Sequence, residues 1–145
     1  MKVFLALMCL ALVTVGGCKS GKELPKVDGI KWKLVELNGK EVVLSNPESE
    51  IFMFFDSADK KVNGRAACNR FFGNYEMEGE KLTFSSMGAT RMACPADSEW
   101  EDEFFEMLEV VDAYAVEEGR FTFLSKEEPV AVLQAVEQDM HTPKQ

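Results

Sequence analysis

The sequence has little of what most enzyme active sites require. Its only histidine, His141, lies close to the C-terminus. A histidine that activates a serine or cysteine must be held in a fixed geometry, which a terminal segment does not readily supply. The spacings of a phosphate-binding loop, an HExxH zinc motif and an EF-hand loop are also absent. We therefore predict no catalytic residue, no cofactor and no metal site.

Basic residues are few as well. The chain has 16 lysines and arginines against 25 aspartates and glutamates, which gives a formal net charge of −9 at pH 7. No long run of basic residues interrupts the sequence. Affinity for nucleic acid depends on neutralising phosphates with such residues, so the composition argues against nucleic acid as a partner.

One apolar run is prominent, and it is too short to span a bilayer as a helix. After Lys2, the residues from Val3 to Val15 are nearly all apolar, about 13 positions where a transmembrane helix needs about 20. Such a run is typical of a secretory signal. It ends in small residues directly before Cys18. We predict that residues 1–17 are a lipoprotein signal peptide and that Cys18 carries the lipid; the alternative is an ordinary signal with an incidental cysteine.

The lipid on Cys18 would attach the protein permanently, because each buried CH₂ of its acyl chains contributes about 0.8 kcal/mol. Lys19 stands where some inner-membrane lipoproteins have a retaining aspartate, which favours the outer membrane; whether the protein faces the periplasm or the cell exterior stays open. Residues 18–28 form the lipidated cysteine and a polar tether. The ten residues 19–28 reach roughly 33–36 Å when extended. Their lysines could attract anionic headgroups, or the segment could be a plain soluble linker.

Residues 29–138 are expected to form one domain, followed by a flexible tail at 139–145. Alternation at 32–37, the turn signal Asn38-Gly39 and a returning strand at 41–44 indicate a hairpin. The apolar run 51–55 predicts a buried or central strand. Further strands are expected at 65–75, 81–84, 113–116, 120–124 and 130–136, with turns or bends at 61–64, 73–74, 78–80 and 118–119.

One segment has the period of a helix. Apolar residues recur at helical spacing from Glu99 to Val111, and Asp97 or Ser98 can cap its N-terminus. The predicted fold class is α+β: a mostly antiparallel, meandering or partly open barrel-like sheet with one amphipathic helix packed across it.

The cysteines can be sorted by position. If Cys9 leaves with the signal and Cys18 is acylated, Cys68 and Cys94 remain. In an oxidising envelope compartment two leftover cysteines favour one structural disulfide, worth about 3.5 kcal/mol in the chain-entropy model. A redox or metal role is the alternative, but the CxxC spacing is missing and two thiols without a histidine make a poor zinc site.

Two arginines lie close to these cysteines in sequence. A disulfide would bring Arg70 and Arg91 into one neighbourhood, where they could contact an anionic ligand or a partner. Alternatively each pairs with a carboxylate such as Glu76 or Asp97. Asn69 belongs to the same candidate site, and we expect it to bond the backbone at a bend.

The predicted helix has an acidic side, which could hold a metal ion or simply face solvent. Like charges at i,i+4 repel weakly, and the arrangement matches no calcium loop, so a solvated face is favoured. The residues concerned are Glu99, Asp102, Glu103, Glu106 and Glu109.

Two motifs resemble the signatures of the META domain family, to which HslJ-like envelope lipoproteins belong. They are the segment 68–75, with Cys-Asn-Arg-Phe at its start, and Thr-Arg-Met-Ala-Cys at 90–94. The resemblance implies an envelope protein, a mostly antiparallel α+β fold similar to secretin pilotins, and no established enzyme activity. It places the family's cysteines on Cys68 and Cys94, and its motif arginines on Arg70 and Arg91.

Three functions are consistent with these features. The first is a non-catalytic, lipid-anchored, monomeric module for binding, assembly or envelope stress tolerance, whose partner is an envelope protein or lipid. The second is a pilotin-like carrier that holds a lipid in a barrel interior. The third, an enzyme acting on envelope glycans through carboxylates near the two arginines, is the least favoured. The phenylalanines assigned to the carrier interior are Phe52, Phe54, Phe55, Phe84, Phe121 and Phe123.

Overall fold

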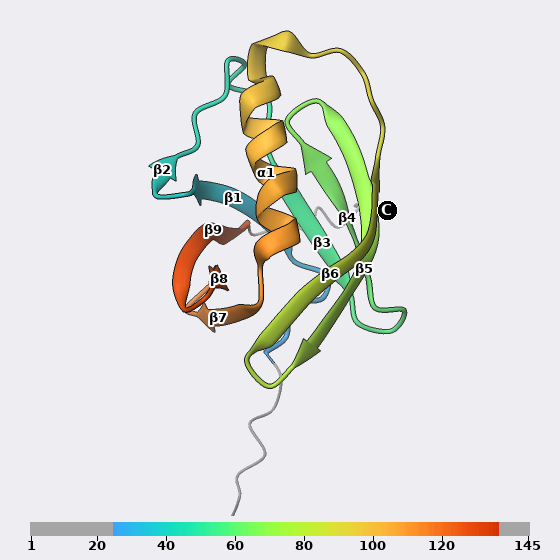
Figure 1. Cartoon of the computed structure of the whole chain (residues 1–145), viewed down its shortest axis with the longest axis vertical. Coiled ribbons are helices and arrows are strands. Elements are labelled where there is room, and N and C mark those ends of the chain that lie inside the picture. Colours follow the sequence, from blue (N-terminus) through green and yellow to red (C-terminus); the bar gives the residue numbers. More distant parts are fainter. Residues whose placement is uncertain (1–24, 137–145) are drawn as a thin grey trace, which may run out of the picture.

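The strands form one antiparallel sheet that curls into a ring, and a single helix packs across it (Figure 1). The computed structural model describes residues 25–136. The predicted signal peptide, Cys18, most of the tether, His141 and the predicted tail lie outside the described residues. The predicted α+β fold class is confirmed.

The sheet contains nine strands. Strand β9 also pairs with β1, which closes the ring. The helical elements are a short 3₁₀ helix, η1 (Pro95–Asp97), and α1 (Ser98–Val110). In spatial order the strands are β2 (Lys40–Glu41), β1 (Lys31–Leu37), β3 (Phe52–Asp56), β4 (Lys61–Ala66), β5 (Asn69–Glu78), β6 (Lys81–Ala89), β7 (Ala113–Glu117), β8 (Arg120–Ser125) and β9 (Glu128–Val136).

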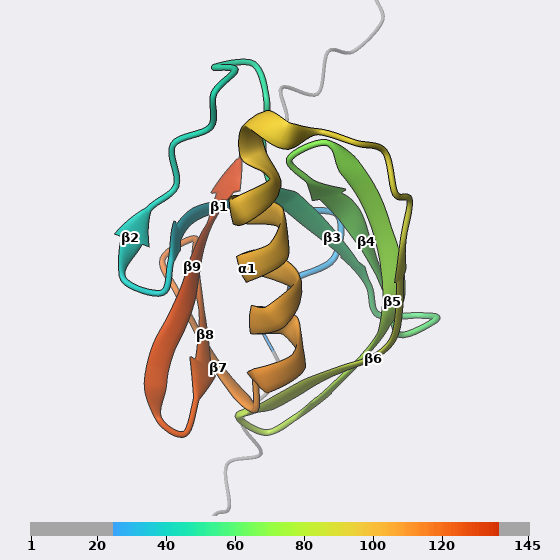
Figure 2. The same ribbon diagram turned by 45° about the horizontal axis from the view of Figure 1, so that its top comes forward.

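The ring is weakest between β6 and β7. These strands share one residue pair, Lys81 with Ala113, flanked by hydrogen bonds from Leu82 N–H to Asp112 O and from Tyr114 N–H to Glu80 O. Beyond that contact the strands diverge, and α1 lies between β7–β9 on one side and β3–β6 on the other (Figure 2). The rest of β6 therefore runs beside the helix instead of beside a strand.

Aromatic side chains fill the interior of the ring. The ring centroids of Trp32 and Phe121 are 5.0 Å apart, those of Phe55 and Tyr75 4.9 Å, and those of Phe121 and Phe123 4.8 Å. All five side chains are almost completely buried. At roughly 1.5–3 kcal/mol for each large apolar side chain, this cluster accounts for much of the burial that stabilises the fold.

The helix adds Phe104, Met107 and Leu108 to the same core, with Phe104 5.2 Å from Phe71 of β5. Phe52 and Phe54 were assigned to the interior, and this is wrong. They alternate with the buried Met53 and Phe55, so they project from the outer face of β3 and are half-buried.

Several turns differ from the predicted ones. The segment 61–64 was expected to turn, but it lies within β4. A glycine is required at position 64 because β3 lies too close for a side chain: a Cβ atom on residue 64 would lie 2.0 Å from the carbonyl oxygen of Phe52. The chain reverses instead at 57–60 and at Ala67-Cys68, where Ala67 has a positive φ of 54°. The bend at Gly73-Asn74 is a shift of register between Phe72 and Asn74.

The returning strand of the first hairpin is β2, shorter than the expected 41–44. Helix α1 begins at Ser98 with Asp97 as its N-cap residue, but no side chain caps it. The Asp97 carboxylate instead accepts hydrogen bonds from the backbone and hydroxyl of Ser45, both at 2.8 Å. Asp97 thus fixes the loop after β2 against the start of the helix. Within residues 25–136, no helix has the length and hydropathy that crossing a bilayer requires.

Candidate functional site

A disulfide between Cys68 and Cys94 joins the turn after β4 to the segment that leads into α1. The two Cα atoms are 6.2 Å apart. The predicted disulfide is confirmed. Since both thiols are used in it, neither is available in this form as a metal ligand.

Asn69 follows the disulfide and is almost completely buried, with 2% of its surface exposed. Its side-chain oxygen accepts hydrogen bonds from Met92 N–H at 2.7 Å and Thr90 Oγ1 at 2.9 Å. Its side-chain nitrogen donates to Glu101 Oε1 at 2.6 Å and to the carbonyl of Met92 at 3.2 Å. The backbone N–H of Asn69 donates to the other oxygen of Glu101 at 3.1 Å. The side chain thus joins β5, the segment 90–93 and α1.

The expected bonding of Asn69 to backbone is found, at Met92. Because its oxygen accepts two hydrogen bonds and its nitrogen donates two, the polar capacity of the side chain is used inside the protein. This arrangement favours a role in holding the site together. Direct contact between Asn69 and a ligand stays a prediction without support from the geometry.

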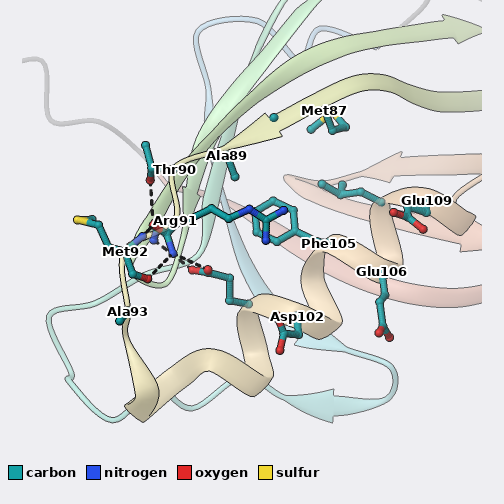
Figure 3. Close-up of a pocket in the computed structure, with 14 residues that line it drawn as sticks. Met87, Ala89, Thr90, Arg91, Met92, Ala93, Asp102, Phe105, Glu106 and Glu109 are labelled. Carbon is teal, nitrogen blue, oxygen red and sulfur yellow. Dashed lines mark hydrogen bonds between the residues drawn. The ribbon is translucent and has the colours of Figure 1, made fainter.

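Next to Asn69 an open groove of about 560 Å³ separates the end of β6 from α1 (Figure 3). Its strand wall is formed by residues 87–93. The side chains of Met87, Phe105 and Leu108 supply apolar surface. The helix wall consists of Glu101, Asp102, Phe105, Glu106, Leu108 and Glu109.

Arg91 is the one basic residue that lines the groove, and four carboxylates line it with Arg91. Figure 3 shows its side chain extending from the strand wall toward the helix. Arg91 forms no ion pair with any residue between 25 and 136. The predicted alternative of a pair with Asp97 is not found, since Asp97 bonds Ser45. The groove is therefore acidic overall, with one cation inside it.

Arg70 is joined to Thr90, the residue before Arg91, by hydrogen bonds of its backbone. Its N–H donates to Thr90 Oγ1 and its carbonyl accepts from Thr90 N–H, at 3.1 and 2.9 Å. The side chain of Arg70 is exposed beside Arg65 of β4, outside the groove. The disulfide thus brings the backbones of the two motifs together, whereas the side chain of Arg91 lies in the groove and that of Arg70 lies outside it. Within the described part of the chain, Arg70 has no ion pair with Glu76 either.

The acidic side of α1 serves more than one surface. Glu103 accepts hydrogen bonds from Asn38 at 3.2 Å and Lys40 at 3.3 Å, so it ties the first hairpin to the helix. Asp102, Glu106 and Glu109 line the groove. No group of three candidate metal ligands occurs within residues 25–136.

Glu101, Phe105 and Met87 line the groove but were not among the predicted site residues. Glu101 and Phe105 are separated by one helical turn, so their shared face could have been recognised from the i,i+4 spacing. Met87 had no such signal, because β6 was expected to end at residue 84, before Ser86 with its positive φ.

The ring-like antiparallel sheet, the helix across it and the disulfide beside the groove define a small disulfide-bonded α+β domain. This chain belongs to the META domain family, whose family model matches residues 25–138. The resemblance seen in the two sequence motifs is thereby confirmed. The META family is not known for an enzymatic activity.

Solved structures agree on the fold. A protein from Burkholderia xenovorans, determined by NMR, superposes with a TM-score of 0.63 at 20% identity, covering 77% of this chain and 85% of that one. A DUF4847 family protein from Bacteroides vulgatus superposes with a TM-score of 0.56 at 14% identity, covering 78% and 96%. At these identities the likeness supports the fold alone. The comparison with curated proteins found no match to this chain.

Proposed function

We propose that this protein is a lipid-anchored envelope protein whose META domain binds a partner instead of catalysing a reaction. The anchor is inferred from the signal-like N-terminus and Cys18. The observation that carries the binding role is the groove between β6 and α1, which is held open by the disulfide and by Asn69. Its volume lies in the range of about 300–1,000 Å³ that is typical of ligand pockets.

The charge of the groove indicates the kind of partner. Four carboxylates surround the single guanidinium of Arg91, so a small free anion would be repelled by the helix wall. A protein segment with basic and apolar side chains fits better, because Asp102, Glu106 and Glu109 would attract its charges while Met87 and Phe105 contact its apolar groups. Arg91 would then bind a carboxylate or a backbone carbonyl of the same segment.

The edge of β6 suggests how such a segment binds. Beyond Leu82, whose N–H bonds the carbonyl of Asp112, β6 pairs with β5 on one side and, within residues 25–136, has no strand partner on the other, where α1 and the groove lie. An extended peptide can add to a free edge and obtain its affinity from main-chain hydrogen bonds and its specificity from side-chain pockets. Residues Met87 to Ala89 belong both to this edge and to the groove.

An enzyme fits this groove less well. A glycosidase places two carboxyl groups on either side of the bond that it cleaves. The carboxylates of the groove all project from α1, so they approach a bound substrate from one side. The predicted glycan hydrolase is therefore not the function that we propose.

The alternative is a lipid carrier. Its site would have to be the groove, since the ring interior is occupied by the packed side chains of Trp32, Phe55, Phe121 and Phe123. The acidic wall that attracts a basic segment does not favour the headgroup of an anionic lipid. Native mass spectrometry of the chain extracted in mild detergent would support the carrier if a lipid remained bound, and the binding module if none did.

Photo-cross-linking in the producing cells tests the binding role. A photoreactive phenylalanine analogue replaces Met92, a groove residue that is 57% exposed, and in a control chain Val43, which is 68% exposed and outside the groove. We expect one discrete cross-linked product from position 92 and none from position 43. The substitutions Asp102→Lys and Glu106→Lys together should abolish it. Equal labelling from both positions would contradict the binding role.

The anchor is tested separately. The substitution Cys18→Ala should release the protein from the membrane fraction.

A further inference from the structure

Two rows of side chains on the outer face of β1, β3, β4 and β5 are basic, although the protein as a whole is acidic. The next row of the same face holds Asp56 opposite Lys61, and Glu76 lies farther along β5. Residues directly opposite each other in antiparallel strands project to the same side. The pairings Lys33–Phe52, Phe52–Arg65 and Arg65–Arg70 therefore place three cations and a phenylalanine in one row across the sheet.

A second row lies beside the first. Phe54 pairs with Asn63 and Asn63 with Phe72. Lys31 lies two residues before Lys33 and so projects from the same side of β1. We call these two rows the basic face: Lys31, Lys33, Phe52, Phe54, Asn63, Arg65, Arg70 and Phe72.

The cations of the basic face are poorly neutralised. Glu50 pairs with Lys31 and, at 3.4 Å, with Lys33. Arg65 and Arg70 stand opposite each other, which is unfavourable for like charges. Neither arginine forms an ion pair within residues 25–136. Four cations thus face one carboxylate, in a chain whose net charge is −9.

Aromatic rings accompany these charges. Phe72 has 60% of its surface exposed, more than any other aromatic residue within 25–136. Phe52 and Phe54 stack edge to face, and the Lys31 ammonium lies 4.5 Å from the centre of the Phe52 ring. Cations beside one exposed and two half-buried aromatic rings suit the boundary between headgroups and acyl chains, where rings insert and charges meet lipid phosphates.

The position of the basic face also fits a membrane. Phe71 and Phe72 of β5 project to opposite sides, and Phe71 contacts Phe104 of α1. The helix and the groove are therefore on the side of β5 opposite to the basic face. The chain enters the fold next to these strands, since Asp28 bridges to Phe55 of β3 and bonds Ser57.

We propose that the basic face docks on a bilayer containing anionic lipid, so that the groove points away from the membrane. This inference rests on the proposed lipid anchor, because a tether of about ten residues keeps the face within roughly 33–36 Å of the bilayer. An acidic protein surface would satisfy the same charges. The bilayer is favoured because the anchor brings it within reach.

Tryptophan fluorescence tests the docking. The full lipidated chain with Phe72→Trp is reconstituted into vesicles of brominated phosphatidylcholine, with or without about one-third phosphatidylglycerol. Bromine quenches a tryptophan that reaches the acyl boundary. The matched control is Val110→Trp, at a 53% exposed position at the end of α1. The parent chain gives the background from Trp32 and Trp100.

We expect quenching of the tryptophan at 72 only with phosphatidylglycerol, and none at 110. The quenching at position 72 should disappear at about 0.5 M salt, where the electrostatic screening length falls to about 4 Å. The double substitution Arg65→Glu with Arg70→Glu should lower the docked-to-undocked ratio at least about tenfold. The control Arg65→Lys with Arg70→Lys keeps both charges and should preserve the ratio. It also checks that the fold tolerates substitution at these two positions. Equal quenching with and without anionic lipid, or equal quenching at 72 and 110, would overturn the proposal.

Vesicle flotation of the same samples separates docking from anchoring. A chain that floats without quenching at 72 contradicts the docked orientation and leaves the anchor intact. A chain that does not float contradicts the anchor, and the docking proposal fails with it.

Discussion

At the scale of single residues, Asn69 determines the geometry of the groove. Its amide bonds both Met92, in the strand wall, and Glu101, on the helix. The carboxylate of Glu101 accepts from the side chain and from the backbone of Asn69. The two walls are therefore held at a defined separation by one buried polar group. A buried polar side chain with fully used hydrogen bonds specifies one arrangement, whereas apolar contacts alone would permit several.

Replacing Asn69 with alanine should destabilise the domain and loosen the groove. The change leaves the Met92 N–H and Glu101 Oε1 without their side-chain partner, although the backbone N–H at position 69 still bonds Glu101 Oε2. Each unsatisfied buried group costs about 1–3 kcal/mol, so we expect a loss of about 2–4 kcal/mol. The measurement is the free energy of unfolding in urea. Asn63→Ala, on the exposed face of β4, is the matched control and should change it by less than about 0.5 kcal/mol. Similar values for both variants would show that Asn69 does not hold the walls.

At the scale of elements, periodicity explains which parts of the fold were predictable. Helical spacing located α1 to within one residue at each end, and alternation located β1 and β8. These patterns are visible because each element buries one side. The boundary between β3 and β4 was missed because Asn63-Gly64 has the composition of a turn, while the glycine is required for close packing against β3. Contacts between distant segments impose that requirement, and local sequence does not contain it.

The candidate site was predictable only in part, for the same reason. The motif cysteines and Arg91 were identified, and they do lie beside the groove. The opposite directions of Arg70 and Arg91 follow from the register of β5 with the segment after β6. The groove itself depends on the divergence of β6 from β7. Neither the directions of the two arginines nor the divergence of the two strands can be recognised from a local sequence pattern.

The disulfide stabilises the element that carries the groove wall. Residues 68 and 94 are separated by 26 positions, for which the chain-entropy model gives about 3.5 kcal/mol, so reduction should lower the free energy of unfolding by about 2–4 kcal/mol. Urea unfolding with and without dithiothreitol measures the loss. The Cys68→Ser/Cys94→Ser variant should resemble the reduced parent and should not respond to the reductant. A parent chain that is equally stable in both conditions would contradict a stabilising role.

At the scale of the whole molecule, the two proposed surfaces lie on opposite sides of β5. The acidic groove borders α1, and the basic face covers the outside of the strands that α1 packs against. Charges of opposite sign are thus separated across one layer of sheet. Near an anionic membrane such a molecule has a preferred orientation, because the basic face is attracted and the helix is repelled. That orientation would present the groove to partners away from the bilayer.

The buried tyrosines make the stability of the whole fold sensitive to alkaline pH. Burial raises the pKa of Tyr75 to about 12, with the charges of Asp28 and Asp56 adding to the effect. Burial also raises the pKa of Tyr114, whose hydroxyl donates to the carbonyl of Gly79 at 2.9 Å. In the unfolded chain a tyrosine ionises near about pH 10. The neutral form is thus favoured by folding, and its contribution is fully present below that pH and is lost as the pH rises toward about 12.

We expect the free energy of unfolding of the parent chain to fall above about pH 10, by up to about 1.4 kcal/mol per pH unit for each tyrosine. Urea unfolding at a series of alkaline pH values measures this, and phenolate absorbance reports the ionisation directly. Tyr75→Phe keeps the ring contact with Phe55 and removes the ionisable group, so its stability should fall less steeply over the same range. The two chains differ only in this hydroxyl, so the difference between the two slopes reports the ionisation of Tyr75. If the slopes coincide, ionisation of Tyr75 is not coupled to folding, and the ring lies closer to solvent than its contacts with Phe55 indicate.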